Sequence, residues 1–358
     1  MMARLGDYVN IKTGKLDANV SSKDGQYPFF TCSVEPLKID AYSYDCECVL
    51  VAGNGDLNVK YYNGKFDAYQ RTYIIESKDK NILSVPYLYC FLDGYVEELR
   101  KQSIGGVIKY IKLGNLTEAQ IPTRSIDEQN EVVGNIKKAN ELISCRKQQL
   151  AKLDELVKSR FIEMFENSSF SVFRLGDMCS KITDGTHKTP NYLDTGITFI
   201  SAKNIVNGEL DFSDVKYISE QEYVEIQKRC QTKKGDILLS KSGSLGSPVI
   251  VKTEEKIGLF ESLAVIKYDR SKLLPEFLCE QLKADRIQKQ FKEGTKGVAI
   301  KHLHLGVIAN IDIIVPPLEL QNQFAAFVEQ TDKSKFEIQK SLQQLETLKK
   351  ALMQKYFG

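Results

Sequence analysis

The chain has 358 residues, of which 42% are hydrophobic and 27% are charged. This composition is ordinary for a soluble globular protein, and the length allows two or three domains. The formal net charge of +2 does not by itself indicate a nucleic-acid partner. No apolar run reaches the roughly 18 residues of a membrane span, and the first residues lack the apolar core of a signal peptide. We therefore expect a cytoplasmic protein whose eight cysteines are reduced.

Residues 1–122 predict a strand-rich globule. Short apolar runs at Val49–Ala52 and Tyr69–Ile75 are bounded by Gly, Asn, Asp and Pro, as is typical of β-strands. A helix is expected over Pro86–Gln102, because proline favours the first turn of a helix. Pro122 then marks the exit from this globule.

Residues 123–167 contain a long helix in which apolar side chains recur at alternating steps of three and four residues. This spacing is that of a coiled-coil seam. At about 1.5 Å per residue, a helix over Ile126–Phe165 would be about 60 Å long, too long to be buried in one small globule, so it requires a partner helix. Its seam residues are Val132, Ile136, Ala139, Ile143, Leu150, Leu153, Val157 and Met164.

Residues 168–316 predict a second strand-rich globule. Strands are expected at Thr198–Ile200, Asp236–Ser240 and Ser262–Lys267, again between turn-forming residues. A helix is expected over Pro275–Lys292. Each globule thus consists of several strands and one short helix, followed by one long helix.

Residues 317–358 form the second long helix, which repeats the first. A shift of 192 residues lays Leu318–Phe357 on the first helix without a gap, and matches Gln129 to Gln321 and Phe165 to Phe357. We expect the two helices to pack antiparallel, with the globules at opposite ends and related by an approximate twofold axis. The second seam comprises Val328, Ile338, Leu342, Leu345 and Leu352.

The globules repeat as well, so the chain is an internal duplication. Its opening Leu5-Gly6-Asp7 returns 170 residues later as Leu175-Gly176-Asp177, and Lys109 returns 192 residues later as Lys301. The additional residues lie in the first two-thirds of the second copy, where the two copies share little sequence. A common scaffold with two divergent faces is suited to reading two different targets with one geometry.

Two polar residues interrupt the seam. Arg146 occupies a seam position whose counterpart is Ile338, and Lys335 corresponds to Ile143. Such residues can fix the register of two antiparallel helices, as buried polar residues do in other coiled coils. Alternatively, their long side chains extend to solvent at the edge of the seam.

The order of globule, long helix, globule and long helix resembles the specificity subunit of type I restriction-modification systems. The resemblance also rests on the RLGD openings and on ITDGTHKTPNY, FISAKNI, GDILLSKSGSLG and VPPLELQNQF, and it covers essentially the whole chain. It implies an α+β fold with two target recognition domains, each reading one half of a split site on double-stranded DNA. The two long helices would pair antiparallel as a spacer.

The resemblance also implies partners. Two methyltransferase subunits would dock on the helices, and restriction subunits would join through the assembled complex. S-adenosylmethionine is expected on the methyltransferase subunits, so the chain itself would hold no cofactor and would not be catalytic.

A polar loop in the second globule offers groups that reach phosphates and base edges. Thr183, Asp184, Thr186, His187 and Lys188 surround a glycine there. Without the repeat, a solvated turn would be the simpler interpretation of this loop.

A second loop, Ser240–Ser244, leaves an apolar strand and could present backbone amides and Lys241 to an anion. It is not a P-loop, because GxxxxGK[ST] is absent. Lys109 and Lys301 occupy equivalent places, which favours a repeated structural or phosphate-binding role over two ordinary surface lysines.

The candidate DNA contacts combine these loops with the corresponding positions of the first globule. That globule departs from the motifs, because Lys12-Thr13-Gly14-Lys15 stands where the second has Thr183-Asp184-Gly185-Thr186. Likewise, Gly53-Asn54-Gly55-Asp56 stands where the second has Lys241-Ser242-Gly243-Ser244. The candidates are Lys12, Thr13, Lys15, Asn54, Gln70, Arg71, Lys109, Thr183, Asp184, Thr186, His187, Lys188, Lys203, Lys241, Ser242, Ser244, Lys296 and Lys301.

Other chemistry has little support in the sequence. His302 and His304 could bind a metal, but no acidic or cysteine ligand is near them in the sequence, so no metal site is expected. We find no GxGxxG, no amino-methyltransferase motif and no nucleophile arrangement. The sequence therefore favours a DNA-recognition chain that positions catalytic partners. The alternatives are a coiled-coil adaptor whose globules bind proteins, or an enzyme with a nucleotide site around Lys241.

Overall fold

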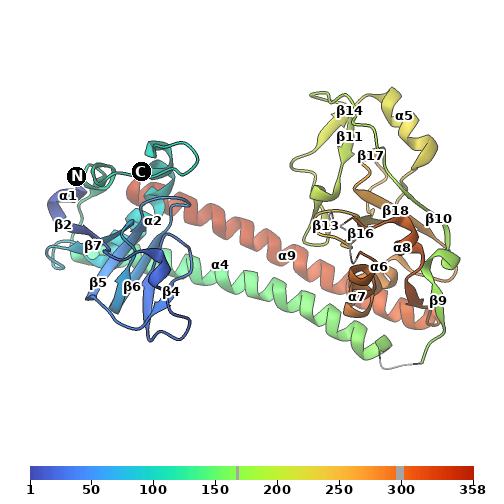
Figure 1. Ribbon diagram of the computed structural model, residues 1–358, viewed down its shortest axis with the longest axis horizontal. Coiled ribbons are helices and arrows are strands. Elements are labelled where there is room, and N and C mark those ends of the chain that lie inside the picture. The colour runs from blue at the N-terminus through green and yellow to red at the C-terminus, as the bar shows by residue number, and fades with distance from the viewer. Residues whose placement is uncertain (167–168, 296–301) are drawn as a thin grey trace. The chain divides into compact units, whose positions relative to one another are not determined.

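The structure is a computed structural model that describes residues 1–166, 169–295 and 302–358 (Figure 1). The chain forms two compact units. The first unit comprises residues 1–148 and 339–358, and the second comprises residues 149–338. Each unit therefore contains one globule together with a segment of each long helix.

The first unit is built on a six-stranded sheet in the order β2-β7-β5-β6-β3-β4. All neighbouring strands are antiparallel except β3 and β6, which are parallel. The two strands expected from the sequence lie within β5 and, from Thr72, within β7. The strands are β2 (Val9–Thr13), β3 (Tyr27–Phe30), β4 (Leu37–Ile39), β5 (Tyr44–Ala52), β6 (Val59–Ala68) and β7 (Thr72–Ser77).

The helix α2 (Val85–Gln102) packs on this sheet and confirms the helix expected there. Ser84 caps its N-terminus by accepting from the backbone N–H of Tyr87, and Pro86 lies in its first turn. Leu88 and Phe91 of α2 share one core with residues of β5 and β7. The smaller elements of this unit are β1 (Met2–Arg4), α1 (Leu5–Tyr8), η1 (Ala18–Val20), α3 (Leu113–Thr117) and β8 (Gln120–Pro122).

The second unit contains a four-stranded sheet in the order β10-β18-β15-β16, with strands at Cys179–Asp184, Leu263–Tyr268, Ile237–Ser240 and Pro248–Ile250. A three-stranded sheet has the order β14-β11-β17, with strands at Lys216–Ile218, Ile197–Ile200 and Ile257–Leu259. Two strand pairs complete the β-structure, β12 (Ile205–Val206) with β13 (Glu209–Leu210), and β9 (Val172–Arg174) with β19 (Asp312–Ile314). Its short helical elements include η3 (Leu175–Met178), η4 (Ala202–Asn204), α5 (Glu220–Arg229) and α8 (Leu305–Ala309).

The expectation of a single helix over Pro275–Lys292 is wrong. The structure has α6 (Pro275–Lys283) and α7 (Asp285–Gly294), separated by Ala284, whose ψ of 141° is extended. The break allows Ile287 and Phe291 of α7 to join the core of the second unit. The side-chain amide of Gln288 donates to the carbonyl of Leu282 (2.7 Å) and so satisfies a carbonyl at the end of α6. Tertiary packing here overrides a sequence that favours one helix.

The two long helices are confirmed as α4 (Ile126–Phe161), continued by a π-helical turn over Ile162–Glu166, and α9 (Leu318–Phe357). In the first unit, Ile136 of α4 shares a core with Tyr356 near the end of α9. In the second unit, the ring of Phe161 lies 5.6 Å from that of Phe324, near the start of α9. A second contact in each unit, Lys147 with Glu346 and Asp154 with Lys335, shows that residue numbers rise along α4 as they fall along α9, so the pairing is antiparallel within each unit. No described helix, including these two, is long and apolar enough to span a membrane.

The predicted seam is more exposed than a globular core. Of the thirteen predicted seam residues, Val132, Ile136, Ala139 and Val157 are buried. The others are half-buried: Ile143, Leu150, Leu153, Met164, Val328, Ile338, Leu342, Leu345 and Leu352. A two-helix seam covers each side chain from one direction only, so this partial burial is expected where no third element packs on the pair.

The polar residue Lys335 is paired across the two helices. Its Nζ lies 2.5 Å from a carboxylate oxygen of Asp154 on α4, and its side chain is 22% exposed. In the first unit, Lys147 of α4 lies 3.6 Å from Glu346 of α9. Interhelical charge pairs thus accompany the apolar seam in both units.

Gln129 and Gln321 extend the duplication to individual hydrogen bonds. Both are buried at the start of a long helix. The side-chain oxygen of Gln129 accepts from the backbone N–H of Ser84, and that of Gln321 accepts from the backbone N–H of Leu274, both at 2.9 Å. Their amide groups donate to two carbonyls each, those of Ile82 and Arg124 in the first unit and of Lys272 and Pro316 in the second. Each glutamine therefore ties a long helix to the segment that precedes α2 or α6.

Candidate nucleic-acid interface

In the second unit, the polar loop predicted from the sequence begins where β10 ends. Gly185 follows Asp184, and a Cβ at this position would lie 2.1 Å from the carbonyl oxygen of Leu259, so only glycine fits. Next, the backbone N–H of Thr186 donates to the carbonyl of Leu259 (2.9 Å), and its carbonyl accepts from Glu261 (3.0 Å). These contacts fix Thr186, and with it the start of the loop over residues 186–188, at the end of β10 in the four-stranded sheet.

A charged cluster lies directly beneath this loop. Asp184 accepts from the ammonium of Lys241 with one carboxylate oxygen and from the guanidinium of Arg229 with the other. His187 lies above them, with Nε2 3.3 Å from Asp184 and Nδ1 2.6 Å from a carboxylate oxygen of Glu261. Burial opposes ionisation of Asp184, but the hydrogen bonds from Lys241 and Arg229 prevail and hold the pKa of this carboxyl below its usual value.

Burial changes the interpretation of three candidates. Asp184 and Lys241 are each only 2% exposed, and Thr183 is also buried. The suggestion that Lys241 presents its ammonium to an external anion is therefore corrected, because the ammonium is already paired inside the protein. Ser242 is half-buried and Ser244 is exposed, so only the tip of this loop reaches the surface. The same burial removes the basis for a nucleotide site centred on Lys241.

Hydrogen bonds of the first unit bring its candidates to a corresponding edge. The backbone N–H of Gly53 donates to the carbonyl of Arg71 (2.8 Å), and that of Gly55 donates to the carbonyl of Lys109 (2.9 Å). Asn54 lies between these two glycines. Gln70 precedes Arg71 at the same edge, where its backbone N–H donates to the carbonyl of Leu16 (2.9 Å).

Most of these side chains are accessible. Those of Thr13, Lys15, Gln70, Arg71 and Lys109 are exposed, whereas Asn54 is half-buried. In the second unit, Thr186 is half-buried, and His187 and Lys188 are exposed. Each unit thus gathers polar and cationic groups, predicted from separate stretches of sequence, on one edge of its sheet.

Two candidate lysines are engaged elsewhere. The ammonium of Lys12 lies 2.6 Å from Glu76 and 5.0 Å from the centre of the Tyr44 ring. Burial alone would lower the pKa of Lys12, but the hydrogen bond to Glu76 raises it. Lys203 lies 3.0 Å from Asp214. The remaining candidates, Lys296 and Lys301, lie outside the described residues.

Arg229 is the residue that the sequence interpretation missed. It ends α5, a helix that was not expected, 45 positions after Asp184. Its side chain is 54% exposed although its guanidinium contacts a buried carboxylate. Nothing in the sequence distinguishes it from the neighbouring Lys228, because only the folded chain brings it to the loop edge.

The two histidines near this edge do not form a metal cluster. The rings of His302 and His304 lie 5.7 Å apart. Burial and the positive charge of Lys241 lower the pKa of His302. Within the described part of the chain, no group of three or more His, Cys, Asp or Glu side chains could hold a metal ion.

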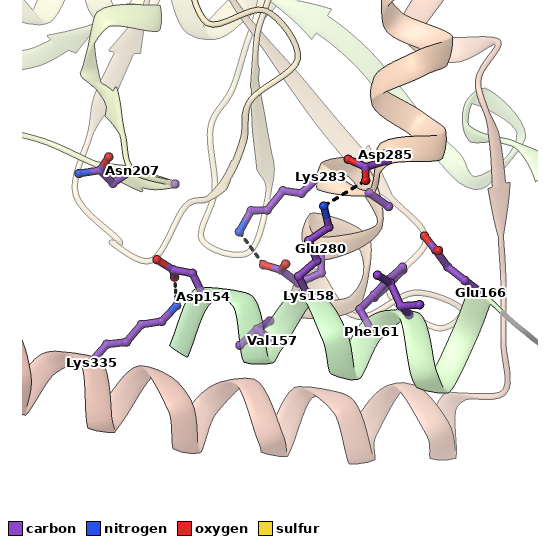
Figure 2. Close-up of a pocket in the computed structure, with 13 residues that line it drawn as sticks. Asp154, Val157, Lys158, Phe161, Glu166, Asn207, Glu280, Lys283, Asp285 and Lys335 are labelled. Carbon is purple, nitrogen blue, oxygen red and sulfur yellow. Dashed lines mark hydrogen bonds and ion pairs between the residues drawn. The ribbon is translucent and has the colours of Figure 1, made fainter. Parts of the chain in front are cut away.

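A cavity of about 300 Å³ lies in the second unit beside α4 (Figure 2). Val157, Phe161 and Ile162 give it an apolar floor. Its three lysines are each paired with a carboxylate, Lys335 with Asp154, Lys158 with Asp285 and Lys283 with Glu280. Four carboxylates against three lysines leave the lining without the excess positive charge that the DNA backbone requires. None of the described candidate DNA contacts lines this cavity.

Comparison with known proteins places the chain in a family. The model of the "Type I restriction modification DNA specificity domain" matches residues 1–155 and 167–350. The specificity subunit of the type I restriction enzyme EcoDI from Escherichia coli is 36% identical over 154 residues, which cover 43% of this chain and 34% of that protein. The match thus spans about a third of that relative's length. The MjaVIII specificity subunit from Methanocaldococcus jannaschii is 21% identical over 388 residues, covering 98% of this chain and 90% of that protein.

Solved structures agree on the fold. The S subunit of the type I restriction-modification system from M. genitalium has a TM-score of 0.62 at 18% identity, and the match covers 100% of this chain and 96% of that one. A second structure, from work on complex assembly and conformational transition of the type I system, has a TM-score of 0.56 at 16% identity, with 100% and 97% coverage. Together with the family model, which matches both halves of the sequence, these findings show that the chain belongs to the family of DNA specificity subunits of type I restriction-modification systems.

Proposed function

We propose that this chain recognises a bipartite sequence on double-stranded DNA, with one half-site read by each globule. The observation that carries this proposal is the recurrence of one polar edge on two copies of the same frame. Gln70 and Arg71 lie at this edge in the first unit, and Glu261 and Ser262 occupy the equivalent positions in the second, as the matching backbone hydrogen bonds show. Equivalent positions with different side chains are what two different half-sites require.

The chain would position catalytic subunits and not react itself. Two methyltransferase subunits would dock on the long helices and carry S-adenosylmethionine, and restriction subunits would join the assembled complex. Membership of the specificity-subunit family supports this division of labour, in which the chain would act in the cytoplasm, where the DNA is. The purified chain should therefore neither bind S-adenosylmethionine at micromolar concentration nor methylate DNA alone, as calorimetry and a methylation assay can test.

A domain exchange tests the modular part of the proposal. Residues 175–315 are replaced by the equivalent globule of a relative with a different target, and the methylated motif is read by sequencing genomic DNA. One half-site should change while the other half and the requirement for the partner subunits stay the same. A chimera that folds, assembles and changes both half-sites would contradict the proposal, as would a complex without sequence preference.

A further inference from the structure

The surroundings of Arg229 suggest how the second globule achieves specificity. One terminal nitrogen of its guanidinium donates to Asp184 and lies 3.2 Å from Nε2 of His187. Its backbone carbonyl accepts from the ammonium of Lys181 (2.6 Å). Within the described residues, the guanidinium makes no other hydrogen bond to the protein, so most of its five donors remain available.

Asp184 is a firm support for this arginine. An exposed ion pair usually contributes little, because two flexible side chains must be ordered in solvent. Here the carboxylate is fixed at the end of β10, is nearly inaccessible to water and is held on its other oxygen by the buried Lys241. The entropic cost of forming this pair therefore falls mostly on the arginine side chain, and the guanidinium is held in place before any ligand arrives.

The donors that Arg229 leaves free suit the edge of a base. Asp184 and Glu261 both lie within contact distance of His187, next to the guanidinium, and Lys241 neutralises Asp184. The major-groove edge of guanine is uncharged and offers two acceptors, O6 and N7. The planar fork of an arginine that is held by a carboxylate matches this pair of acceptors better than a mobile lysine does.

We propose that Arg229 is a specificity-determining residue that reads a guanine in the half-site of the second globule, with Asp184 and Lys241 as positioning residues. This inference rests on the proposed function and adds the chemical identity of one recognised base pair. The first unit has Thr13 and Gly53 at the positions of Asp184 and Lys241, so it lacks this support.

The first test uses the unaltered chain in complex with its methyltransferase subunits. Each guanine of the second half-site is replaced in turn by 7-deazaguanine, which lacks the N7 acceptor. Binding should weaken at one guanine, by about tenfold. If no single replacement weakens binding, or if the methylated half-site contains no guanine on either strand, the inference is wrong.

The second test replaces the arginine. Arg229→Lys keeps the charge and loses the planar fork, and Arg229→Ala loses both. Each variant complex should lose about tenfold or more of its preference for G·C at that one position, with the first half-site unchanged, when the methylated motif is read by sequencing. The Ala variant should also no longer respond to 7-deazaguanine.

The matched control is Lys228→Ala, which removes a neighbouring exposed cation that is paired with Glu225. It should leave every position of the motif unchanged. A uniform loss of binding in the Arg229 variants, with a lower salt dependence and unchanged sequence preference, would assign Arg229 to a phosphate and overturn the inference. Complexes that still methylate a bipartite site with unaltered preference would overturn this inference and leave the proposed function intact. Absence of any bipartite target would contradict the proposed function itself.

Discussion

The two units share a backbone frame but differ in the interior beneath the candidate interface. Thr13 pairs with Tyr73 across β2 and β7, and Asp184 pairs with Ala264 across β10 and β18. The backbone N–H of Gly53 donates to the residue before β7, and that of Lys241 donates to the residue before β18, both at 2.8 Å. These bonds make Thr13 equivalent to Asp184, and Gly53 equivalent to Lys241.

The differences between these equivalent positions are coupled. At these two positions the second unit has a carboxylate and a lysine that neutralise each other, whereas the first unit has a threonine and a glycine. The ring of Tyr73 comes within 3.1 Å of where a Cβ of Gly53 would stand, and the equivalent of Tyr73 is the small Ala264. A buried charge without its partner is strongly unfavourable, so the pair can only be gained or lost together. The comparison teaches that several departures from a motif in one copy can be coordinated, so that this copy still packs without an unpaired charge.

The largest effect should come from breaking the pair in the second unit. Asp184→Ala leaves the buried ammonium of Lys241 unpaired and should destabilise this unit by about 3–5 kcal/mol. Urea unfolding of the full-length chain, combined with hydrogen exchange of β15, measures this loss.

Thr13→Ala at the equivalent exposed position of the first unit is the control and should change stability by less than about 0.5 kcal/mol. The double variant Asp184→Ala with Lys241→Met should recover most of the loss. Similar effects at both positions would contradict the distinction between the units.

The two buried glutamines should respond alike, because they make the same hydrogen bonds in both units. Gln129→Met and Gln321→Met each leave one N–H and two carbonyls without a partner and should cost about 2–4 kcal/mol. Thermal unfolding of the full-length chain gives the values, and Gln344→Met on the exposed face of α9 serves as the control. Losses that differ by more than about 2 kcal/mol would show that one unit no longer relies on the repeated contact.

Acidification should weaken the second unit through Asp184. The pKa of this carboxyl is lower in the folded chain than its ordinary value of 3.8, because of Lys241 and Arg229. Its contribution to stability is therefore complete above that ordinary value and is lost as pH falls through the folded pKa. The free energy of unfolding is measured from about pH 5 to about pH 2.5 in steps of about 0.5 pH units. It should fall more steeply for the unaltered chain than for the double variant Asp184→Ala with Lys241→Met. Parallel declines would exclude a stabilising role for the ionised pair.

The smallest effect is expected in the helix pair. Lys335→Ile gives the second unit the residue that the first unit has at Ile143, and removes the partly exposed pair with Asp154. Stability should change by less than about 1 kcal/mol in either direction, because such pairs contribute little and isoleucine suits the seam. Circular dichroism on heating measures the change. A loss of more than about 2 kcal/mol would mean that Lys335 sets the register of the helices.

Much of the fold could be predicted from the sequence, and the reason is periodicity. The seam residues define α4 and α9 to within a few positions, since a helix repeats its face at a spacing that the sequence records directly. The duplication gave further support, because Gln129 and Gln321, which the sequence matches, make equivalent hydrogen bonds in the structure. The break at Ala284 could not be foreseen, because it depends on where Ile287 and Phe291 are buried, and no proline or glycine marks it.

The candidate interface was predicted less completely. The sequence alone selected the polar loop at His187 for its donor groups and Lys109 for its repeat, and named Arg71 as a candidate, but it did not bring Arg71 and Lys109 together. It also determined the family resemblance and the repeat, which depend on residue order. Only the tertiary structure decided that Asp184 and Lys241 lie inside, and that Arg229 lies beside His187. Burial and proximity between residues 45 or more positions apart are properties of the packed chain, and no local pattern encodes them.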